Sequence, residues 1–419
     1  MDIIHVQGGR PLKGELKIQG SKNAVLPIMA ATILIEGCCY IKNCPYISDV
    51  ECMCSLLESI GCRIHWENDG VKIDASSIRD NTLPREKVVS MRSSIMLLGP
   101  LLARCREASL DHPGGCVIGE RPVDLHLYLL QMLGAEFVIE QDHIKGRVKE
   151  LRGTVIHLPF PSVGATENGI LASVLANGIT TLYNCAKEPE IQQLCWFLNS
   201  AGAKIEGVGT DCLIIEGVRK LYPVSYRVCA DRIVAGTYLF SVVAATGRAF
   251  FYDTPWKDME NVLDIAGMMG CRISLDKEGI EVWQPDRAKA VSGIKTAVYP
   301  GFPTDLQSVL MAAFAVSRGD GVIEETIFSD RFHSARELVR MGADIRIEGK
   351  YAIIKGREKL NAASVLAEDL RGGAALVLAG ICADGDSLVG NIRFIERGYE
   401  DICRDYGLLG AHIKKMGRN

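Results

Sequence analysis

One cysteine of the chain lies in a setting that suits a reactive thiol. Cys116 follows two glycines in the stretch PGGCVIGERPVD, which begins at Pro113, and a third glycine lies three residues further on. Gly114, Gly115 and Gly119 free the backbone around the thiol, as a loop that closes over a substrate requires. The alternative is a surface turn with an incidental thiol. Arg121 speaks against it, because an arginine is a poor choice for the start of the helix that Pro122 predicts.

Polar and charged residues also mark the predicted starts of six apolar helices. They are Lys22 and Asn23, Arg92, Ser162 with Gly164, Asp231 with Arg232, Asp305, and Asp369 with Arg371. Helix capping explains any one of them, and Asp305 in FPTDLQ is an especially good cap candidate. Lysine and arginine, however, bring positive charge to the positive end of a helix dipole. Lys22, Arg92 and Arg371 therefore predict an anionic ligand where helix N-termini converge.

Composition argues against several classes of protein. The net charge of -4 and the pI near 6.1 lack the basic excess of a nucleic-acid-binding protein. The first residues, MDIIHVQGG, do not form a signal peptide, and no apolar stretch is long enough to span a membrane. We therefore expect a cytoplasmic protein whose 15 cysteines are reduced.

The motifs of other common sites are missing from the sequence. Paired CxxC motifs would suggest a zinc site, and the sequence has none. It also lacks a Walker sequence, which would indicate nucleotide hydrolysis, and a strand-linked GxGxxG motif, which would indicate redox chemistry with a dinucleotide. His112 could pair with Cys116, but a protease-type dyad also needs an orienting group and an oxyanion hole. No metal and no redox cofactor is predicted.

The elements that must position these residues recur along the chain. A helix end of the form Leu-x-x-Gly-(Ala/Cys), followed by a strand, appears six times at intervals of 68 to 73 residues. Each glycine fits a helix C-cap, where a positive φ lets the chain leave the helix. The six glycines are Gly61, Gly134, Gly202, Gly270, Gly342 and Gly410.

A β-hairpin pattern follows five of these glycines, and a second helix, apolar nearly all round, precedes the central strand of every repeat. The sixth repeat ends after one strand, and the N-terminal segment offers the missing strands. The sequence thus predicts an α/β fold of six units in two similar domains, with a cleft between them. The first domain would span residues 22–229, and the second would combine residues 1–21 with 230–419.

Six segments of the chain resemble the UDP-N-acetylglucosamine enolpyruvyl transferases of the EPSP synthase family. They are SKNA at Ser21, PGGCVIGERPVDLH at Pro113, SVGAT at Ser162, FPTD at Phe302, DLRGG at Asp369 and ERGYE at Glu396. The resemblance spans essentially the whole chain, and the cysteine stretch is its most specific part. It implies a two-domain inside-out α/β barrel with the active site in the interdomain cleft, which agrees with the count of six repeats.

The resemblance implies two substrates, phosphoenolpyruvate and UDP-N-acetylglucosamine. The products would be phosphate and the 3-enolpyruvyl ether, in the first committed step of peptidoglycan synthesis. Lys22, Arg121 and Arg397 would hold the phosphate and carboxylate of phosphoenolpyruvate, since arginine binds both groups bidentately. The residues expected to hold substrate also include Asn23, Arg92, Pro122, Val123, Asp124, Leu125, Ser162, Val163, Gly164, Asp305, Ile327, Asp369 and Arg371.

The same resemblance assigns the catalytic roles. Asp305 would accept the proton of the sugar 3-hydroxyl, and Cys116 would protonate the methylene carbon of phosphoenolpyruvate. Lys22 and Arg397 would stabilise the charge of the tetrahedral intermediate. The charge of Arg121 would favour the thiolate of Cys116, so we expect alkylation of this residue by the epoxide fosfomycin.

Departures from the family pattern leave two alternatives open. Phe160 stands where many members carry a lysine, Glu396 stands where aspartate is commoner, and Gly372 and Gly373 replace bulkier residues. One alternative is the sister enzyme that acts on shikimate 3-phosphate, which lacks the cysteine stretch. The other is a non-catalytic paralogue that binds the UDP-sugar, against which the full set of acid, base and cations argues.

Overall fold

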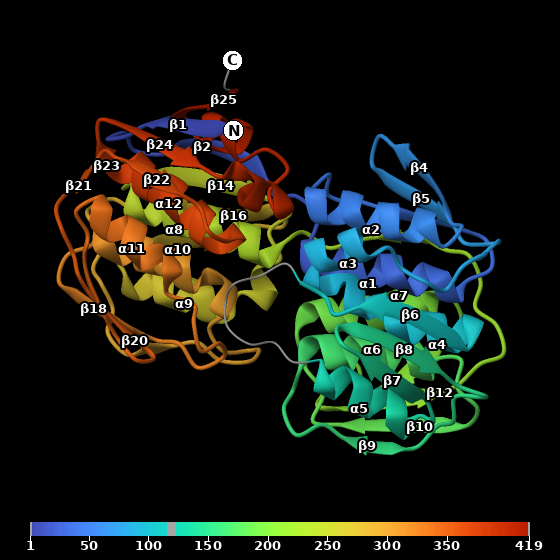
Figure 1. Ribbon diagram of the computed structural model, residues 1–419. Coiled ribbons are helices and arrows are strands. Elements are labelled where there is room, and N and C mark those ends of the chain that lie inside the picture. The colour runs from blue at the N-terminus through green and yellow to red at the C-terminus, as the bar shows by residue number, and fades with distance from the viewer. Residues whose placement is uncertain (1, 115–122, 418–419) are drawn as a thin grey trace. The chain divides into compact units, whose positions relative to one another are not determined.

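The computed structural model describes residues 2–114 and 123–417 of the chain, which divide into two compact units (Figure 1). Residues 20–114 and 123–229 form the unit called here the first domain, and residues 2–19 and 230–417 form the second domain. Cys116, Arg121 and Pro122 lie outside the described residues.

Both domains contain three copies of one repeat, and its six glycines mark the ends of six outer helices. All six glycines have a positive φ, between 81° and 105°, so the predicted C-caps are confirmed. The helices that end before them are α2 (Ser48–Ser59), α5 (Asp124–Met132), α7 (Pro189–Ser200), α9 (Glu260–Met268), α11 (His333–Arg340) and α13 (Ile402–Leu408).

The sheets of the first domain share one plan. A central strand pairs antiparallel with the second strand of the hairpin that follows the outer helix. A short parallel strand adds the fourth position in two sheets, and a parallel bridge between Thr82 and Ser109 takes its place in the other. The strands are β3 (Cys38–Lys42), β4 (Arg63–Glu67), β5 (Gly70–Asp74), β6 (Glu107–Asp111), β7 (Glu136–Glu140), β8 (His143–Arg147), β9 (Val155–His157), β10 (Ile179–Tyr183), β11 (Lys204–Glu206), β12 (Cys212–Glu216) and β13 (Ser225–Arg227).

The second domain repeats this plan and takes two strands from the N-terminus. β1 (Ile3–Gln7) lies between β24 and β25, so one strand of the N-terminal segment completes the sheet of the last repeat. β2 (Lys13–Lys17) instead pairs in parallel with β14 of the fourth repeat. The other strands are β14 (Arg248–Tyr252), β15 (Arg272–Leu275), β16 (Gly279–Trp283), β17 (Ile294–Lys295), β18 (Asp320–Glu324), β19 (Asp344–Glu348), β20 (Tyr351–Lys355), β21 (Leu360–Asn361), β22 (Ser364–Leu366), β23 (Ala383–Asp384), β24 (Asp386–Gly390) and β25 (His412–Met416).

The apolar helices form the core of each domain, as their composition predicts. The first domain buries α1 (Lys22–Ala31), α4 (Leu98–Cys105) and α6 (Val163–Ser173), and the second buries α8 (Arg232–Ala244), α10 (Gln307–Ala315) and α12 (Leu370–Cys382). One further α-helix, α3, spans Arg85–Ser90, and the 3₁₀ turns are η1 (Thr32–Leu34), η2 (Arg92–Leu97), η3 (Trp256–Asp258), η4 (Thr304–Leu306) and η5 (Ile392–Arg397). In the described part of the chain, no helix is long and apolar enough to cross a membrane.

Candidate active site

In the first domain, Lys22 begins α1 and forms a buried ion pair. Its Nζ lies 2.7 Å from Oδ2 of Asp49 on α2, and both side chains are almost wholly buried. The hydroxyl of Ser21 caps α1 by accepting from the amide of Ala24. Asn23 is half-buried beside Lys22. The sequence thus places a cation at a helix N-terminus, as predicted, with a carboxylate to hold it.

The next two helix starts of this domain are those of η2 and α6. Arg92 begins the 3₁₀ turn η2 and not the α-helix, and its Nη1 donates to the carbonyl of Pro113 at 3.2 Å. Ser162 caps α6 by accepting from the amide of Ala165, and Val163 is the first residue of the helix. The capping interpretation is therefore right for Ser162. The backbone amides that follow it lie at the positive end of the helix dipole.

His126 on α5 lies against the start of α6. A Cβ on Gly164 would lie 2.9 Å from Cε1 of His126, so only glycine fits there. Asn168 orients the imidazole: its Oδ1 accepts from the amide of Gly99, and its Nδ2 donates to the carbonyl of Ile95. The second proton of the Asn168 amide is then directed at Nδ1 of His126, 2.8 Å away. Nδ1 must be the acceptor, so the imidazole carries a proton on Nε2, beside Gly164.

The remaining predicted residues of this domain lie at the start of α5. Val123 is buried, Asp124 is the exposed first residue of the helix, and Leu125 is half-buried. Cys116, Arg121 and Pro122 lie outside the described residues, so their predicted roles stay predictions.

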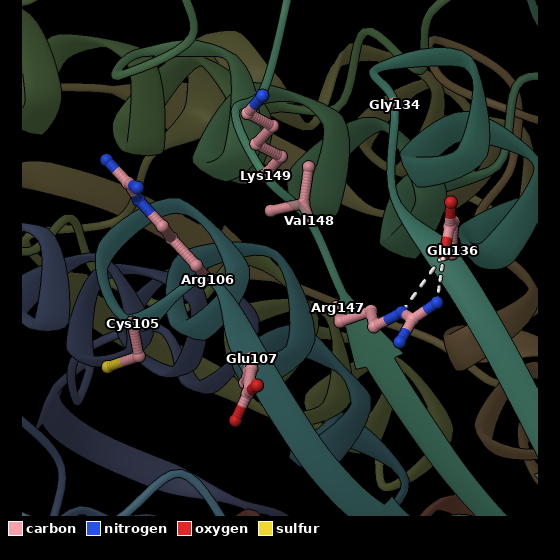
Figure 2. A pocket seen from close by; sticks show the side chains of 8 residues that line it. All are labelled: Cys105, Arg106, Glu107, Gly134, Glu136, Arg147, Val148 and Lys149. Carbon is pink, nitrogen blue, oxygen red and sulfur yellow. Dashed lines mark hydrogen bonds and ion pairs between the residues drawn. The ribbon is translucent and has the colours of Figure 1, made fainter.

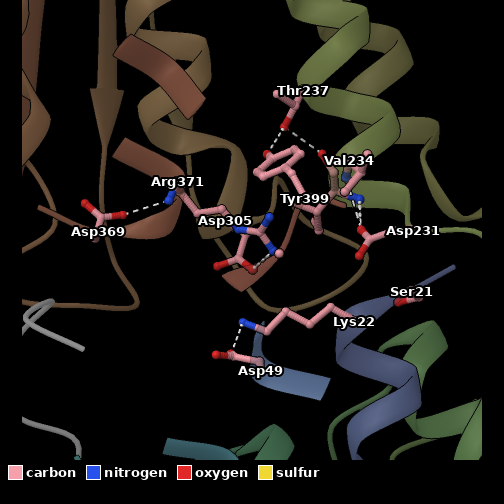
Figure 3. Close-up of polar contacts among 12 residues, drawn as sticks. Ser21, Lys22, Asp49, Asp231, Val234, Thr237, Asp305, Asp369, Arg371 and Tyr399 are labelled. Atoms are coloured by element: carbon pink, nitrogen blue, oxygen red, sulfur yellow. Dashed lines mark hydrogen bonds and ion pairs between the residues drawn. The ribbon is translucent and has the colours of Figure 1, made fainter. Parts of the chain in front are cut away.

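In the second domain, Asp305 joins two buried arginines, Arg331 and Arg371, and Figure 3 shows its contact with Arg371. Its Oδ1 lies 2.7 Å from Nη2 of Arg331, and its Oδ2 lies 3.0 Å from Nη2 of Arg371. Both guanidiniums are 5% exposed. The interpretation of Asp305 as a helix cap is wrong, because the residue lies within η4 and its carboxylate engages side chains of two other segments.

Arg371 is held in a buried and polar setting. Burial by itself lowers the pKa of a guanidinium, but the nearby Asp305, Tyr399 and Asp231 oppose it and raise the pKa of Arg371 above its usual range. Its Nη1 is buried and makes no hydrogen bond with the described part of the chain. A buried charged donor without a partner is costly, and an anionic ligand would satisfy it.

The buried helices of this domain are capped by carboxylates. Asp369 caps α12 by accepting from the amides of Arg371 and Gly372, and Asp231 caps α8 in the same way. Capping is thus right for Asp231 and Asp369, and at α12 it fixes the backbone that carries Arg371. Ile327 lies in the loop after β18, where its amide donates to Glu325, and Arg397 ends η5 half-buried.

The departures from the family pattern have local explanations. A Cβ on Gly372 would lie 2.6 Å from Oδ2 of Asp369, and one on Gly373 would lie 2.6 Å from a side-chain carbon of Ile395, so neighbours fill this space. Glu396 pairs with Lys415 at 2.6 Å. Phe160 is exposed.

The sequence analysis missed several of these residues, namely Asp49, His126, Asn168, Arg331 and Tyr399. Arg331 could have been predicted, since it lies in the loop after β18. This loop is the counterpart of the segment after β6 that contains Cys116 in the sequence. Asp49 lies in the corresponding segment after β3. Asp49 and Arg331 therefore lie in equivalent segments of two repeats, and comparing these segments could have found both residues.

One hollow of the first domain lies away from these residues (Figure 2). It has a volume of about 530 Å³ and lies at the C-terminal end of α4, beside Cys105, Arg106 and Lys149. Arg92 and the start of α6 lie at the other end of the α4 segment, so this hollow is not part of the candidate site.

Comparison with known proteins places the chain in a family. The family model described as EPSP synthase (3-phosphoshikimate 1-carboxyvinyltransferase) matches residues 6–405. UDP-N-acetylglucosamine 1-carboxyvinyltransferase 2 of Caldanaerobacter subterraneus is 44% identical over 416 residues, covering 99% of this chain and 100% of the relative. UDP-N-acetylglucosamine 1-carboxyvinyltransferase of Acinetobacter baylyi is also 44% identical, over 418 residues, with coverage of 99% and 100%.

Solved structures share the fold at low identity. The enolpyruvyl transferase NikO from Streptomyces tendae has a TM-score of 0.89 at 22% identity, covering 99% of this chain and 98% of its own. EPSP synthase from Acinetobacter baumannii has a TM-score of 0.77 at 17% identity and covers both chains fully. The expected two-domain fold of six repeats is therefore confirmed, and the chain belongs to the EPSP synthase family, with the UDP-N-acetylglucosamine 1-carboxyvinyltransferases as its relatives over the full length.

Proposed function

We propose that the protein transfers the enolpyruvyl group of phosphoenolpyruvate to the 3-hydroxyl of UDP-N-acetylglucosamine and releases phosphate. The reaction is the first committed step of peptidoglycan synthesis. The observation that carries this proposal is the full-length identity of 44% with relatives that are named for this activity. We also propose that the enzyme works in the cytoplasm, where its thiols stay reduced.

Phosphoenolpyruvate brings two anionic groups, and the chain offers cations for both. Lys22, Arg121, Arg371 and Arg397 are proposed to hold its phosphate and carboxylate. The orphaned Nη1 of Arg371 supports this, because a buried guanidinium nitrogen lacks only an acceptor. Arg331 would assist by holding Asp305 from its other side.

The nucleotide sugar is proposed to bind to helix starts of the first domain together with the loop after β18. The N-terminus of α6 supplies amide groups at its positive dipole end, which suits a diphosphate. The residues proposed for this substrate are Asn23, Arg92, the run Arg121 to Leu125, Ser162, Val163, Gly164, Asp305 and Ile327.

The proposed chemistry is addition followed by elimination. Asp305 accepts the proton of the 3-hydroxyl, and the resulting oxygen attacks C2 of phosphoenolpyruvate. Cys116 gives a proton to C3, so that a tetrahedral intermediate forms with phosphate still bonded to C2. A proton of the C3 methyl group then returns to the thiolate of Cys116 as the bond from C2 to the phosphate oxygen breaks. The double bond returns and phosphate departs, while the guanidiniums stabilise its charge.

Fosfomycin would exploit the same thiol. The thiolate of Cys116 would open the epoxide ring and form a thioether, which removes the proposed proton donor.

Phosphate release from phosphoenolpyruvate tests the proposal. We expect release that depends on UDP-N-acetylglucosamine and none with shikimate 3-phosphate in its place. Asp305→Ala should reduce turnover by at least about a thousandfold, the scale of losing a general base. The absence of release from the wild-type protein, at high enzyme concentration, would refute the transferase activity. A retained rate in Asp305→Ala would refute only the role of Asp305.

A further inference from the structure

Glu325, the first residue after β18, is a buried carboxylate that the proposed chemistry does not use. It is 3% exposed. Its Oε1 accepts from the hydroxyl of Thr296 at 2.9 Å, and its Oε2 accepts from the hydroxyl of Thr304 at 2.8 Å. Oε1 also accepts from the amides of Ile327 and Phe328, at 2.8 Å and 3.2 Å. These four donors replace the water that a buried carboxylate loses, and they join the segment before α10 to the loop after β18.

The two oxygens of Glu325 support both members of one ion pair. Thr304 immediately precedes Asp305, whose Oδ1 lies 2.7 Å from Nη2 of Arg331. Phe328 is held by its amide, and Cζ of Arg331 lies 5.1 Å from the centre of the Phe328 ring. A cation at this distance is attracted to the face of an aromatic ring. The contacts thus close a circle that runs from Glu325 through Thr304, Asp305, Arg331 and Phe328 back to Glu325.

We propose that Glu325 is a positioning residue for Asp305. Through Thr304 it holds the backbone that carries the Asp305 carboxylate. Through Phe328 it holds the ring beneath Arg331, and Arg331 orients one oxygen of that carboxylate. A general base acts only within hydrogen-bond reach of its proton, so a displacement of about 1 Å can cost about a hundredfold in rate. The role of Asp305 as the base rests on the proposed function, whereas the placement of its carboxylate does not.

The second domain contains a matched control. Glu337 on α11 is 7% exposed, and its Oε2 accepts from the amide of Leu366 on β22 at 2.9 Å. The same carboxylate pairs with Arg340 at 2.9 Å. Glu337 therefore also joins two segments of the domain through a buried carboxylate. Its contacts with Leu366 and Arg340 lie outside the candidate site, so its loss should affect stability alone.

Steady-state kinetics of Glu325→Ala and Glu337→Ala test the proposal. We expect kcat to fall by at least about thirtyfold in Glu325→Ala, because the base is displaced, and to stay within about twofold in Glu337→Ala. Glu325→Gln should recover most of the loss, since an amide oxygen still accepts from the amides of Ile327 and Phe328. A carboxylate that served the fold alone would give the same kcat in the two alanine variants, and this result would overturn the proposal.

Two substitutions of Thr304 test the same network if Glu325→Ala does not fold. Thr304→Val keeps the shape of the side chain and removes its hydroxyl, whereas Thr304→Ser keeps the hydroxyl. We expect kcat to fall by at least about fivefold in Thr304→Val and to stay within about twofold in Thr304→Ser, because a hydrogen bond to a charged group is lost only in the first. Equal rates in these two variants would overturn the proposal.

Hydrogen exchange separates this proposal from the proposed function. The backbone amides of residues 326–331 should exchange with deuterated water at least about tenfold faster in Glu325→Ala than in the wild type or in Glu337→Ala, because this loop loses the acceptor that holds it. Equal exchange in all three proteins would overturn the positioning role, whether or not the protein turns over substrate. Faster exchange in Glu325→Ala, in a protein whose wild type releases no phosphate, would support the positioning role and refute the proposed function alone.

Discussion

The buried cations of the candidate site are held by carboxylates. Lys22 pairs with Asp49, while Arg331 and Arg371 share Asp305. Taking a charge out of water costs several kcal/mol unless partners replace the hydration. A guanidinium has five N–H donors, and the recorded bonds to Asp305 use one nitrogen of each arginine. The arrangement is thus stable enough to fold and still suited to an anionic ligand.

Substitution of Cys116 tests the role of its thiol. We expect Cys116→Ser to lose at least about a hundredfold in kcat, because an alcohol is a far weaker acid, and Cys116→Asp to keep activity, since a carboxylic acid can donate a proton. Cys116→Asp should also resist fosfomycin, which needs the thiolate. Phosphate release with and without fosfomycin gives both results. Normal turnover by Cys116→Ala would show that the thiol is not the acid.

At the scale of single residues, the sequence predicts which residues belong to the site better than it predicts which residues contact one another. Lys22, Asp305 and Arg371 could be found because each stands at a helix start of the repeat. The partners of Asp305 could not, because they lie 26 and 66 residues away and only the folded chain brings them together. The same is true of Asn168, which orients His126 across 42 residues.

Among the secondary-structure elements, α12 links stability to the site most directly. Its cap, Asp369, accepts from the amides of Arg371 and Gly372 at 2.9 Å each. Because Arg371 is the second residue of this helix, the cap also fixes the backbone from which its guanidinium extends.

Asp369→Ala should therefore affect both stability and turnover. We expect the free energy of unfolding to fall by about 1 kcal/mol, the usual cost of losing a cap, and the KM for phosphoenolpyruvate to rise. Asp401→Ala is the control, since Asp401 caps the outer helix α13 by accepting from Arg404. Urea unfolding should show a similar loss for both variants, and kinetics should change only for Asp369→Ala. Equal KM values for phosphoenolpyruvate in the two variants would show that Asp369 caps the helix without positioning Arg371.

The repeat made the elements predictable. Six glycines at regular spacing require six helix ends, and helices that are apolar on every side can only be core helices. The pattern could not predict which turns at the helix starts are 3₁₀ turns. Arg92 and Asp305 fall in 3₁₀ turns before α4 and α10, and only there can the Asp305 carboxylate leave the helix N-terminus and reach two arginines.

At the scale of the whole molecule, buried thiols make the free energy of unfolding depend on pH in the alkaline range. Burial raises the pKa to about 12 for a group of thiols whose folded form stays protonated: Cys54, Cys62, Cys185, Cys195, Cys271, Cys382 and Cys403. In the unfolded chain these thiols ionise near pH 8.5. Above that pH the unfolded state binds fewer protons than the folded state, so the free energy of unfolding falls as pH rises.

Urea unfolding between pH 7 and pH 10.5, with a reductant present, measures this effect. We expect stability to fall above about pH 9, by about 1.4 kcal/mol per pH unit for each buried thiol. Replacing Cys195 by alanine should make the fall shallower by one such increment, whereas replacing the exposed Cys38 should not. Constant stability up to pH 10.5 would contradict the protonated state of the buried thiols.

The path of the chain predicts which piece of it can fold alone. The second domain needs residues 2–19, because β1 lies between β24 and β25 and because Val6, Leu12, Leu16 and Ile18 are buried in its core. Each such side chain contributes about 1.5–3 kcal/mol, so residues 230–419 alone should not fold cooperatively. Ile3 pairs with Met416, so the two ends of the domain lie close together, and a short linker can join residue 417 to residue 2. We expect this permuted segment, 230–417 followed by 2–19, to unfold cooperatively in urea. A sharp transition in residues 230–419 alone, or none in the permuted segment, would refute the discontinuous domain.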